Sequence, residues 1–422
     1  MTLALAATLA AACSAGEAEP QGRAVEHLDR APPQVEAPAL DLDIDVAQTS
    51  ASGLSSGAFM AVQFHVAYSS IMRGVAAFAG GPFTCSQGKA VHAVTRCMRP
   101  AGALDPAPFV ATTNALAAAG DVDPVAGLPG QRVFLFGGAG DTTIQPAVMD
   151  GLRDYYAAVG VAPTDLAFER RRPGTGHTMP TVDSGGDCAS SRAPFVGRCG
   201  YDGAGRALEH IYGPLAPRAA IAAGAFVALD QRDFIAAPSA HSLADEAWAY
   251  VPKACASGAR CRVHVAFHGC LQSASKVGDA FYRHAGYNEW ADDNRIVVLY
   301  PQAIAVPGSN PNGCWDWWGY DSPDYAKKSA PQMRMVKAMI DRLAGAAPAP
   351  DADAPADAGA PSTSPACVYA SNAAHVAAGR ARSAWGFAFA RGSGQALGFD
   401  SAYVSTALTR VAEDVYVLGA CR

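Results

Sequence analysis

Gly53-Leu54-Ser55-Ser56-Gly57 decides the fold, because an apolar run over residues 58–71 follows it at once. Small residues two positions before and two positions after a serine allow a sharp turn from a strand into a helix. This turn lifts the serine hydroxyl above the edge of a sheet and leaves the next backbone N–H free to stabilise an oxyanion. The spacing therefore predicts a nucleophile elbow at Ser55. A Gly-x-Ser-x-Gly pattern alone also occurs in ordinary glycine and serine loops, so the rest of the chain has to support it.

The composition restricts the class of protein. With 422 residues, 50% hydrophobic and 17% charged, the chain is long enough for one large core and a small second domain. No run reaches the ~18 consecutive apolar residues of a membrane-spanning helix. The formal net charge of −6 offers no basic stripe for a phosphate backbone, which argues against nucleic acid as a partner. A neutral substrate fits this composition better.

The first twelve residues are apolar and small, and they end at Ala11-Ala12-Cys13-Ser14. This pattern predicts an export signal over residues 1–13, and the Ala-Ala-Cys ending also fits a lipoprotein type that would carry lipid on Cys13. A short frayed helix is the alternative, because no positive charge precedes Arg23. We expect a protein that is secreted or anchored to the cell surface.

Eleven cysteines are too many for a reduced cytosolic enzyme that has no metal-like clustering. Zinc is disfavoured, because the chain has no Cys-x-x-Cys pair and no histidine at ligand spacing beside these cysteines. Without Cys13 an even number remains, which suits disulfides in an oxidising compartment. The predicted pairs are Cys85 with Cys97, Cys188 with Cys199, Cys255 with Cys261, Cys270 with Cys314, and Cys367 with Cys421.

Two segments lack a core pattern and divide the chain. Residues 14–40 are rich in proline and glutamate and predict a tether, and residues 347–365 form a linker of proline, alanine and aspartate. Between them lies a predicted catalytic domain, residues 41–346. Residues 366–422 are predicted to form a small accessory domain.

Within residues 41–346, short β-rich runs alternate with helical stretches, which predicts an α/β sheet with helices on both faces. A turn or polar loop follows each strand, and functional residues are expected in those loops. The predicted strands are 74–79, 132–136, 165–169, 262–267 and 295–300, and the predicted helices are 58–71, 108–119, 145–159, 277–293 and 330–343.

The order of the motifs is unusual. Val265-Ala266-Phe267-His268-Gly269-Cys270 has the pattern of an oxyanion strand and loop, yet it comes about 200 residues after Ser55. In an ordinary α/β-hydrolase this loop precedes the nucleophile. Cutting the chain after residue 343 and joining that end to the strand before Gly53 restores the usual order. The sequence therefore predicts a circularly permuted α/β-hydrolase sheet, a rearrangement that close surface termini make easy.

A serine nucleophile needs an imidazole base, and the imidazole needs a carboxylate that holds its tautomer. Asp141 follows the predicted strand 132–136 in a glycine-rich loop, and His177 follows the next strand after Gly174-Thr175-Gly176. Their chain order after Ser55 is the one that the α/β-hydrolases use. Taken alone, Asp141 also fits a turn or a helix cap ahead of Gln145, and His177 a solvated loop histidine.

Other histidines and acids compete for these roles. None of the competing histidines follows a strand and a glycine turn after the acid, so His177 is preferred. His264 alternates along a strand, which suggests a structural role. The competing bases are His65, His92, His210 and His241, and the reserve acids are Asp183 and Asp187.

The oxyanion hole needs two donors aimed at the developing charge. The N–H groups of Ser56 and Cys270 are the candidates, and a Cys270–Cys314 disulfide would hold the second one rigid. That disulfide would also bring Trp315, Trp317 and Trp318 to the mouth of the site. Three indoles within four residues fit an apolar ligand groove, although tryptophans buried in a core are the alternative.

Together these motifs resemble a known family, the extracellular poly(3-hydroxybutyrate) depolymerases with a circularly permuted α/β-hydrolase fold. The resemblance spans roughly residues 45–345. It implies that Ser55, Asp141 and His177 form the triad, that the amides of Ser56 and Cys270 form the oxyanion hole, and that Trp315 lines a polyester cleft. The poor export signal and the tail depart from the pattern. The motifs are Gly-Leu-Ser55-Ser-Gly-Ala-Phe-Met, Gly-Asp141-Thr-Thr-Ile, Gly-His177-Thr-Met-Pro, His-Gly-Cys270-Leu-Gln and Asn-Gly-Cys314-Trp-Asp-Trp-Trp-Gly-Tyr.

The tail is similar, more weakly, to a small module appended to some depolymerases and related secreted esterases. A tethered module would raise the local concentration of enzyme on an insoluble polymer, and a folded appendage without binding is the alternative. Trp385, Phe387 and Phe389 alternate as on one face of a strand.

We therefore expect a monomeric serine esterase that hydrolyses poly(3-hydroxybutyrate) or a related short-chain polyhydroxyalkanoate, without metal or organic cofactor. Two alternatives stay open from the sequence. One is an esterase for feruloyl or acetyl groups of plant walls. The other is a non-catalytic polymer-binding surface protein in which Ser55 is idle.

Overall fold

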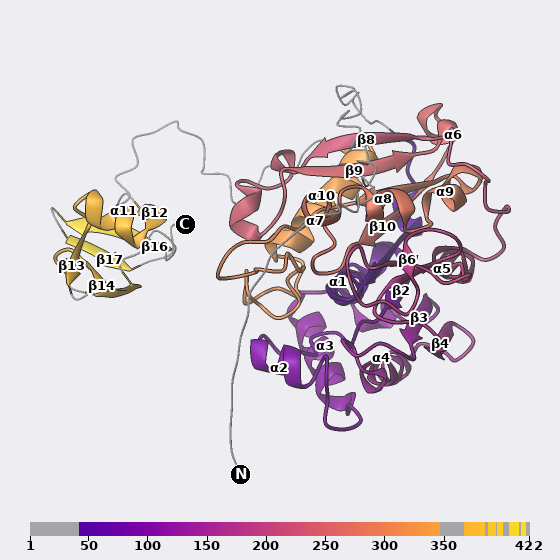
Figure 1. The fold of residues 1–422 in the computed structure, drawn as a ribbon, viewed down its shortest axis with the longest axis horizontal. Coiled ribbons are helices and arrows are strands. Elements are labelled where there is room, and N and C mark those ends of the chain that lie inside the picture. Colours follow the sequence, from indigo (N-terminus) through magenta and orange to yellow (C-terminus); the bar gives the residue numbers. More distant parts are fainter. Residues whose placement is uncertain are drawn as a thin grey trace, which may run out of the picture. The chain divides into compact units, whose positions relative to one another are not determined.

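The computed structural model describes residues 42–346 and, with gaps at 385–386, 394, 400–404 and 413–414, residues 367–418 (Figure 1). An eight-stranded sheet lies at the centre of residues 42–346, in the order β4-β3-β2-β1-β10-β11-β9-β8. β9 runs in the direction opposite to the other seven strands, so its pairings with β11 and β8 are antiparallel and the rest are parallel. Its strands are β1 Thr49–Leu54, β2 Met72–Phe78, β3 Arg132–Gly138, β4 Leu166–Arg172, β8 Ala225–Asp230, β9 Glu246–Val251, β10 Arg262–Phe267 and β11 Ile296–Tyr300.

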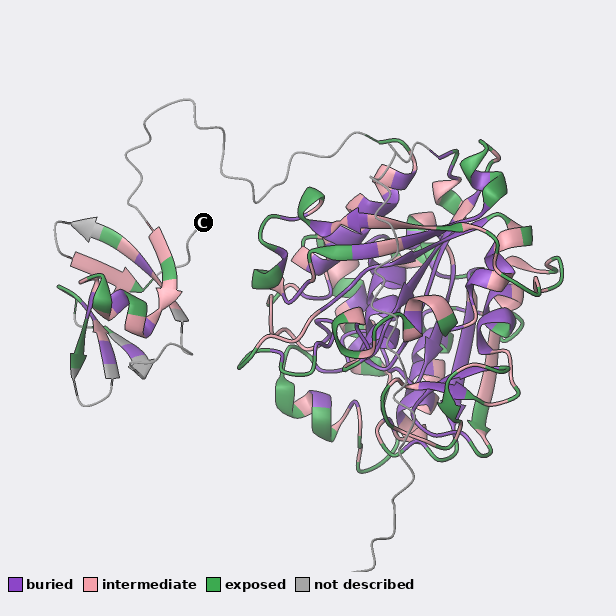
Figure 2. Ribbon diagram, turned by 45° about the horizontal axis from the view of Figure 1, so that its top comes forward, coloured by how far each residue is buried: buried purple, intermediate pink, exposed green. Residues whose placement is uncertain are grey.

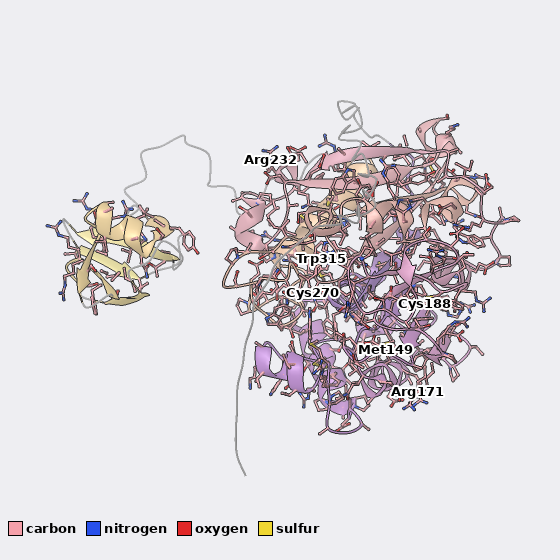
Figure 3. All side chains as sticks on the ribbon, in the orientation of Figure 1. Met149, Arg171, Cys188, Arg232, Cys270 and Trp315 are labelled. Atoms are coloured by element: carbon pink, nitrogen blue, oxygen red, sulfur yellow. A yellow bond between two sulfur atoms is a disulfide. The ribbon has the colours of Figure 1, made fainter. Side chains whose placement is uncertain are left out.

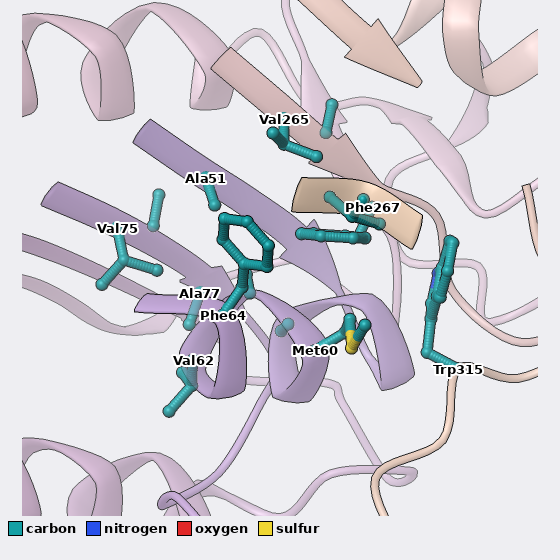
Figure 4. Close-up of a cluster of buried hydrophobic side chains, with 14 of the residues drawn as sticks. Ala51, Met60, Val62, Phe64, Val75, Ala77, Val265, Phe267 and Trp315 are labelled. Carbon is teal, nitrogen blue, oxygen red and sulfur yellow. The ribbon is translucent and has the colours of Figure 1, made fainter. Parts of the chain in front are cut away.

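Helices cover both faces of the sheet, and the central strands are buried (Figure 2). On one face, apolar side chains of β1, β2 and β10 meet α1, where Phe64 lies 6.3 Å from Phe267 between ring centroids (Figure 4). A small second sheet holds β5 Met179–Thr181, β6 Gly186–Asp187 and β7 Val196–Arg198. The helices are α1 Ser56–Ala67, α2 Ala90–Thr95, α3 Ala107–Ala119, α4 Pro146–Ala158, α5 Gly203–Tyr212, α6 Lys253–Ala256, α7 Ala274–Val277, α8 Ala280–His284, α9 Asn288–Asn294 and α10 Pro331–Leu343.

The other face of β1 is polar, because successive side chains of a strand point to opposite faces. The Ser50 hydroxyl lies 2.6 Å from the Tyr212 hydroxyl of α5, and Ser52 donates to the Tyr287 hydroxyl just before α9. The His264 ring bridges the two serines at 2.6 and 2.7 Å. His264 is fully buried, in keeping with the structural role that its position in the strand suggested.

The sheet has the strand order that the permuted motif order predicts. Read from β8 through β11 and then from β1 to β4, the chain reaches the oxyanion loop after β10 before the elbow after β1. The backbone also lies where the predicted join would be, because Leu42 N–H donates to Leu343 O at 3.3 Å. Leu42 and Leu343 lie at opposite ends of the domain in sequence, yet they are neighbours in space.

Most predicted elements are present, one predicted helix is wrong, and several elements, the short helices α2 and α6 among them, were not predicted. The predicted helix 277–293 is wrong, because Gly286 adopts φ +90° and separates α8 from α9. A residue with this φ cannot continue a right-handed helix. The elements between residues 173 and 251 were not predicted, and they include α5, β8 and β9.

Four of the predicted disulfides are present: Cys85–Cys97, Cys188–Cys199, Cys255–Cys261 and Cys270–Cys314. Cys367 is also disulfide-bonded, but its expected partner Cys421 lies outside the described residues. Within the described part of the chain, no helix is long and apolar enough to cross a membrane.

The C-terminal segment has a small core of its own, formed by Ala381, Ala388, Ala390, Leu397 and Leu408. Phe387 and Phe389 lie in β14, whose pairing with β15 shifts register between Ala388 and Phe389, and Trp385 lies outside the described residues. The predicted signal, tether and linker also fall outside them, and the domain boundaries stay predictions. The elements of this segment are β12 Cys367–Ser371, α11 Asn372–Ala377, β13 Ala381–Ala384, β14 Phe387–Ala390, β15 Ala396–Phe399, β16 Ser405–Ala412 and β17 Val415–Leu418.

Candidate active site

Ser55 stands at the sharp turn between β1 and α1. Its backbone has φ 57° and ψ −122°, a strained conformation for a residue with a side chain. Both flanking glycines are required by close contacts. A methyl group at Gly53 would lie 2.2 Å from Gly57 O, and one at Gly57 would lie 2.3 Å from Phe267 O. The turn therefore has the strand-turn-helix geometry of a nucleophile elbow.

Asp141 and His177 come from the loops after β3 and β4, and the structure brings them together. His177 Nδ1 lies 2.8 Å from Asp141 Oδ2, and both side chains are almost fully buried. Since a carboxylate accepts, Nδ1 carries the proton and Nε2 keeps a lone pair for use as a base. The other oxygen, Oδ1, accepts from the amides of Thr143 and Ile144 at 2.8 and 2.9 Å. Asp141 thus also makes the turn that its sequence context predicted.

The loops that carry Ser55, Asp141 and His177 are joined through the carboxyl ends of adjacent strands. Ser55 N–H donates to Phe78 O of β2 at 2.9 Å, and Ala79 N–H donates to Phe136 O of β3 at 3.0 Å. Gly140 N–H then donates to Thr175 O, two residues before His177. Among the described residues, Ser55 Oγ forms no hydrogen bond with His177 in this structure. Catalytic hydrogen bonds in an unliganded enzyme often form only when substrate binds.

The oxyanion loop lies against the elbow, because a methyl group at Gly269 would be 3.4 Å from Ser55 Cβ. In the turn from Gly269 to Gln272, three of the four amides have acceptors: Gln272 Oε1 for Gly269, Asn312 O for Leu271, and Gly269 O for Gln272. Within the described residues, the Cys270 amide has no acceptor. It is therefore free to donate to another group, and its role as an oxyanion donor stays a prediction.

His268 fixes this turn from inside the core. Its Nδ1 donates to Gly269 O at 2.7 Å and its Nε2 accepts from Ala303 N–H at 3.0 Å, which identifies the tautomer. Burial lowers the pKa of His268 to about 4, so the ring is neutral at physiological pH. His268 therefore acts as a structural brace for the oxyanion loop.

The three tryptophans divide between core and surface. Trp315 is 0% exposed and its indole N–H donates to His268 O at 3.0 Å, so the structure does not support the predicted substrate contact of Trp315. It follows Cys314, which is disulfide-bonded to Cys270, and the two labelled residues Trp315 and Cys270 lie near one another in Figure 3. Trp317 is also buried and stacks on Phe59 of α1 with a centroid distance of 4.0 Å. Trp318 is partly exposed and is the indole that a ligand can reach.

Asp316 shapes the loop that presents Trp318. Its Oδ1 accepts from the amides of Gly319 and Tyr320, and its Oδ2 from those of Asp321 and Ser322. Burial raises the pKa of Asp316 to about 6, and these backbone donors act in the opposite direction. The backbone from 316 to 322 therefore wraps around one carboxylate.

Among residues 42–346, all but one of the competing histidines and acids have other partners, the exception being His92. His65 Nδ1 lies 3.0 Å from the Tyr156 hydroxyl, and burial lowers its pKa to about 4. His210 bonds to Asp165 O, and His241 lies 3.0 Å from Asp321. Asp183 pairs with Arg218, and Asp187 caps the Ala189 amide. His92 lies in the short helix α2.

Two positioning contacts were missed from the sequence. Ser191 Oγ accepts from the His177 N–H at 2.9 Å, and the Gln272 side chain bridges the oxyanion loop to residues 194–195. Gln272 lies in the His-Gly-Cys-Leu-Gln motif, which was the only signal that could have pointed to it. No group of three or more metal-ligating side chains occurs among the residues that the structure describes.

The chain is similar to proteins of known activity over most of its length. No profile of a known protein family matches the chain. A poly(3-hydroxybutyrate) depolymerase of Delftia acidovorans is 37% identical, with 90% of this chain and 94% of the relative covered. A polyhydroxybutyrate depolymerase of Talaromyces funiculosus is 36% identical and covers 74% of this chain, with 94% of its own length matched.

Solved structures give the same result. The structure described as "PHB depolymerase (S39A) complexed with R3HB trimer" is similar with a TM-score of 0.68 and 33% identity, over 73% of this chain and 99% of that one. The crystal structure of PHB depolymerase from Penicillium funiculosum has a TM-score of 0.67, with the same identity and coverage. The chain therefore belongs to the poly(3-hydroxybutyrate) depolymerase family.

Proposed function

We propose that this chain is a secreted serine esterase that hydrolyses poly(3-hydroxybutyrate) or a closely related short-chain polyester. The observation that carries the proposal is the buried His177–Asp141 pair, whose loops are bonded to the loop of the strained Ser55 turn, together with the Gly269–Cys270 turn that packs against Ser55. Membership of a family whose named members are polyhydroxybutyrate depolymerases supports the substrate class. A solved neighbour complexed with an R3HB trimer supports it further.

In the proposed mechanism, Ser55 Oγ attacks an ester carbonyl while His177 Nε2 takes its proton. Asp141 holds the imidazole in the Nδ1–H tautomer and stabilises the imidazolium. The amides of Ser56 and Cys270 receive the oxyanion, and each such donor stabilises the transition state by about 3 kcal/mol in comparable sites. His177 then protonates the leaving alcohol, and a water activated by the same ring releases the acyl group from Ser55.

The surroundings suit a neutral, weakly polar chain. Trp318 is partly exposed on a loop that Asp316 holds in place, and Leu271 is 37% exposed directly after the Cys270 donor. Apolar burial against such groups binds repeating ester units without a charged clamp. We propose Trp318 as a substrate contact, and we no longer assign Trp315 to that role.

Secretion fits the four disulfides of the catalytic domain, since such bonds persist in oxidising compartments. Lipid on Cys13, a monomeric state, and polymer binding by residues 366–422 remain parts of the proposal. Mass spectrometry of the mature N-terminus and light scattering test the first two directly.

The decisive test is product analysis after incubation with a poly(3-hydroxybutyrate) film. The wild type should release soluble hydroxybutyrate oligomers, while Ser55→Ala should adsorb to the film equally and release none. Ser69→Ala, at a buried serine outside the site, is the matched control and should retain activity.

Two outcomes would reject the proposal. Cleavage of feruloyl or acetyl esters with no release from the film would favour a plant-wall esterase. Adsorption without hydrolysis by the wild type, together with no labelling of Ser55 by a fluorophosphonate, would favour a non-catalytic binding protein.

A further inference from the structure

Gln272 is a fully buried side chain that joins two segments of the candidate site. Its Oε1 accepts from Gly269 N–H at 2.7 Å, and its Nε2 donates to Pro194 O at 3.0 Å and to Phe195 O at 2.9 Å. Both Nε2 protons and one acceptor lone pair are therefore used. The partners are 77 and 78 residues away in sequence, so this amide connects regions that the chain itself does not connect.

Gln272 Nε2 bonds to a segment that contacts the proposed base, His177. The Cys188–Cys199 disulfide closes residues 188–199, and Ser191 within it accepts from the His177 N–H at 2.9 Å. Phe195 places its ring edge-on to the His177 ring, with 6.3 Å between centroids and 77° between planes. Fixing the carbonyl of Phe195 therefore fixes a side chain that packs directly on the imidazole.

Gln272 Oε1 bonds to the turn that carries the proposed oxyanion donor, the Cys270 amide. Gln272 encloses Gly269 from both directions, because its side chain accepts from Gly269 N–H and its own amide donates to Gly269 O. This closed turn orients the peptide between Gly269 and Cys270, and the N–H of that peptide is the free donor. A rotation of this peptide would point the Cys270 amide away from Ser55.

We infer that Gln272 is a positioning residue that sets the distance and angle between the oxyanion donor and the base. The inference rests on the proposed serine-esterase chemistry and adds a residue to it. A tetrahedral intermediate needs the Cys270 amide and His177 Nε2 on opposite sides of Ser55 at the same time. The Gln272 amide is a direct polar link between the turn that carries the Cys270 amide and the segment that contacts His177.

A glutamine is required for this role, because the contacts demand an acceptor at one end and two donors at the other. Glutamate keeps the shape and the acceptor but loses both donors, and it places oxygen against the Pro194 and Phe195 carbonyls. Methionine keeps the approximate volume and loses every hydrogen bond. The two substitutions thus break the link by different chemistry at the same position.

The chain provides a matched control in Gln131. This buried glutamine also donates from Nε2 to two backbone carbonyls, Ser69 O at 2.6 Å and Gly127 O at 2.8 Å, but it lies outside the site. Gln131→Met and Gln131→Glu remove the same number of donor bonds. They show what the loss of such a buried contact does to stability alone.

The experiment uses the full-length protein with p-nitrophenyl butyrate, a soluble ester with a short acyl chain and an activated leaving group. Active sites are titrated with a fluorophosphonate, so that turnover is expressed per competent site. A trifluoromethyl ketone, whose tetrahedral adduct needs both the oxyanion donors and the imidazolium, reports the geometry through its inhibition constant.

For Gln272→Met and Gln272→Glu we expect kcat per titrated site to fall about 100-fold, the effect of a small misplacement of catalytic groups. KM should change less than about threefold, and the inhibition constant of the ketone should rise in step with the loss of kcat/KM. The Gln131 variants should keep kcat per titrated site and the inhibition constant of the ketone within about twofold of the wild type.

Gln272 variants with wild-type kcat per titrated site and unchanged ketone inhibition would overturn the inference, even if their melting temperatures fell. If Gln272→Met does not fold, the isosteric Gln272→Glu still decides the matter. An enzyme that cleaves the soluble ester but not the polymer film would defeat the proposed substrate and leave the inference on Gln272 intact.

Discussion

At the scale of single residues, each proposed catalytic group is fixed by a backbone contact of its own. The Ser55 turn is constrained by Gly53 and Gly57, Asp141 accepts from two amides, and the His177 amide donates to Ser191. Such fixed geometry lowers the reorganisation that the reaction requires. The chemistry of the site is therefore built on a rigid local backbone.

The tryptophans give a prediction at this scale. Trp318→Ala should raise KM for soluble hydroxybutyrate oligomers several-fold and leave the free energy of unfolding nearly unchanged, because Trp318 is partly exposed. Trp315→Ala should lower the free energy of unfolding by about 3–5 kcal/mol, since it empties a buried site and removes the bond to His268. Urea unfolding and oligomer kinetics measure the two effects. Equal changes in KM for the Trp318 and Trp315 variants would contradict the assignment of Trp318 to substrate binding and of Trp315 to the core.

The sequence allowed Ser55, Asp141 and His177 to be predicted because each lies in a short motif directly after a strand. It did not reveal Gln272 or Ser191 as positioning residues, since their partners lie in other loops and an amide or hydroxyl carries no pattern of its own. Trp315 was assigned to a cleft because an indole is as suited to a ligand groove as to a core. Only its contact with the His268 carbonyl decides between the two.

At the scale of elements, strands in the centre of the sheet were predicted well and the connecting region poorly. β10 has the predicted bounds, and β11 begins one residue later than predicted. The continuous apolar run of β11 is typical of a buried parallel strand. β8 and β9 lie toward the edge of the sheet, where partly exposed residues weaken that signal. The apolar periodicity over 277–293 concealed a break at Gly286, whose positive φ depends on the packing of α8 and α9.

The disulfide that supports the oxyanion loop gives a prediction at this scale. Replacing Cys270 and Cys314 by serine opens a 44-residue loop and should cost about 4 kcal/mol of unfolding free energy, with a fall in kcat because the Cys270 amide loses its anchor. Replacing Cys255 and Cys261 opens a 6-residue loop and should cost about 2 kcal/mol with little change in kcat. Denaturant titration and ester kinetics compare the pairs. A larger loss of kcat on removal of Cys255–Cys261 than on removal of Cys270–Cys314 would refute the role of the Cys270–Cys314 disulfide as an anchor for the oxyanion loop.

At the scale of the whole molecule, the core contains neutral histidines that make stability depend on pH. Burial lowers the pKa of His65 and His268 to about 4 and that of His264 to about 3. The unfolded chain protonates these rings near 6.5, so between pH 6.5 and 4.5 it binds more protons than the folded chain. Stability therefore falls as pH falls through this window. Asp316, whose pKa is raised to about 6, binds a proton in the folded state, which offsets the proton that one of the three histidines takes up in the unfolded chain.

We expect the free energy of unfolding to decrease by roughly 3 kcal/mol per pH unit at the steepest part of this window, about 1.4 kcal/mol for each of two net protons. Urea titrations at pH 6.5, 5.5 and 4.5 measure this slope. His65→Gln should reduce it by about one proton, whereas His284→Gln, at an exposed position, should not change it. A flat profile would show that the buried rings take up protons without unfolding.

The overall topology was predictable because the permutation is visible in the order of short motifs. The oxyanion loop after β10 follows the elbow in sequence, and that order alone indicated the cut and the join. The sequence could not show that the join is closed by a contact. The hydrogen bond from Leu42 to Leu343 is formed only when β1 and α10 are both in place.

That contact also determines how the domain carries a mechanical load. Residues 1–41 and 347–422 attach to the domain next to Leu42 and Leu343, which are bonded neighbours. Tension between the two flanking segments would therefore load this hydrogen bond first, and next the two bonds that join Asp43 and Asp45 to Cys261, ahead of β1 and β10. A chain held at both ends would have to break these outer contacts before the strands that lead to Ser55 and the Cys270 loop came under load.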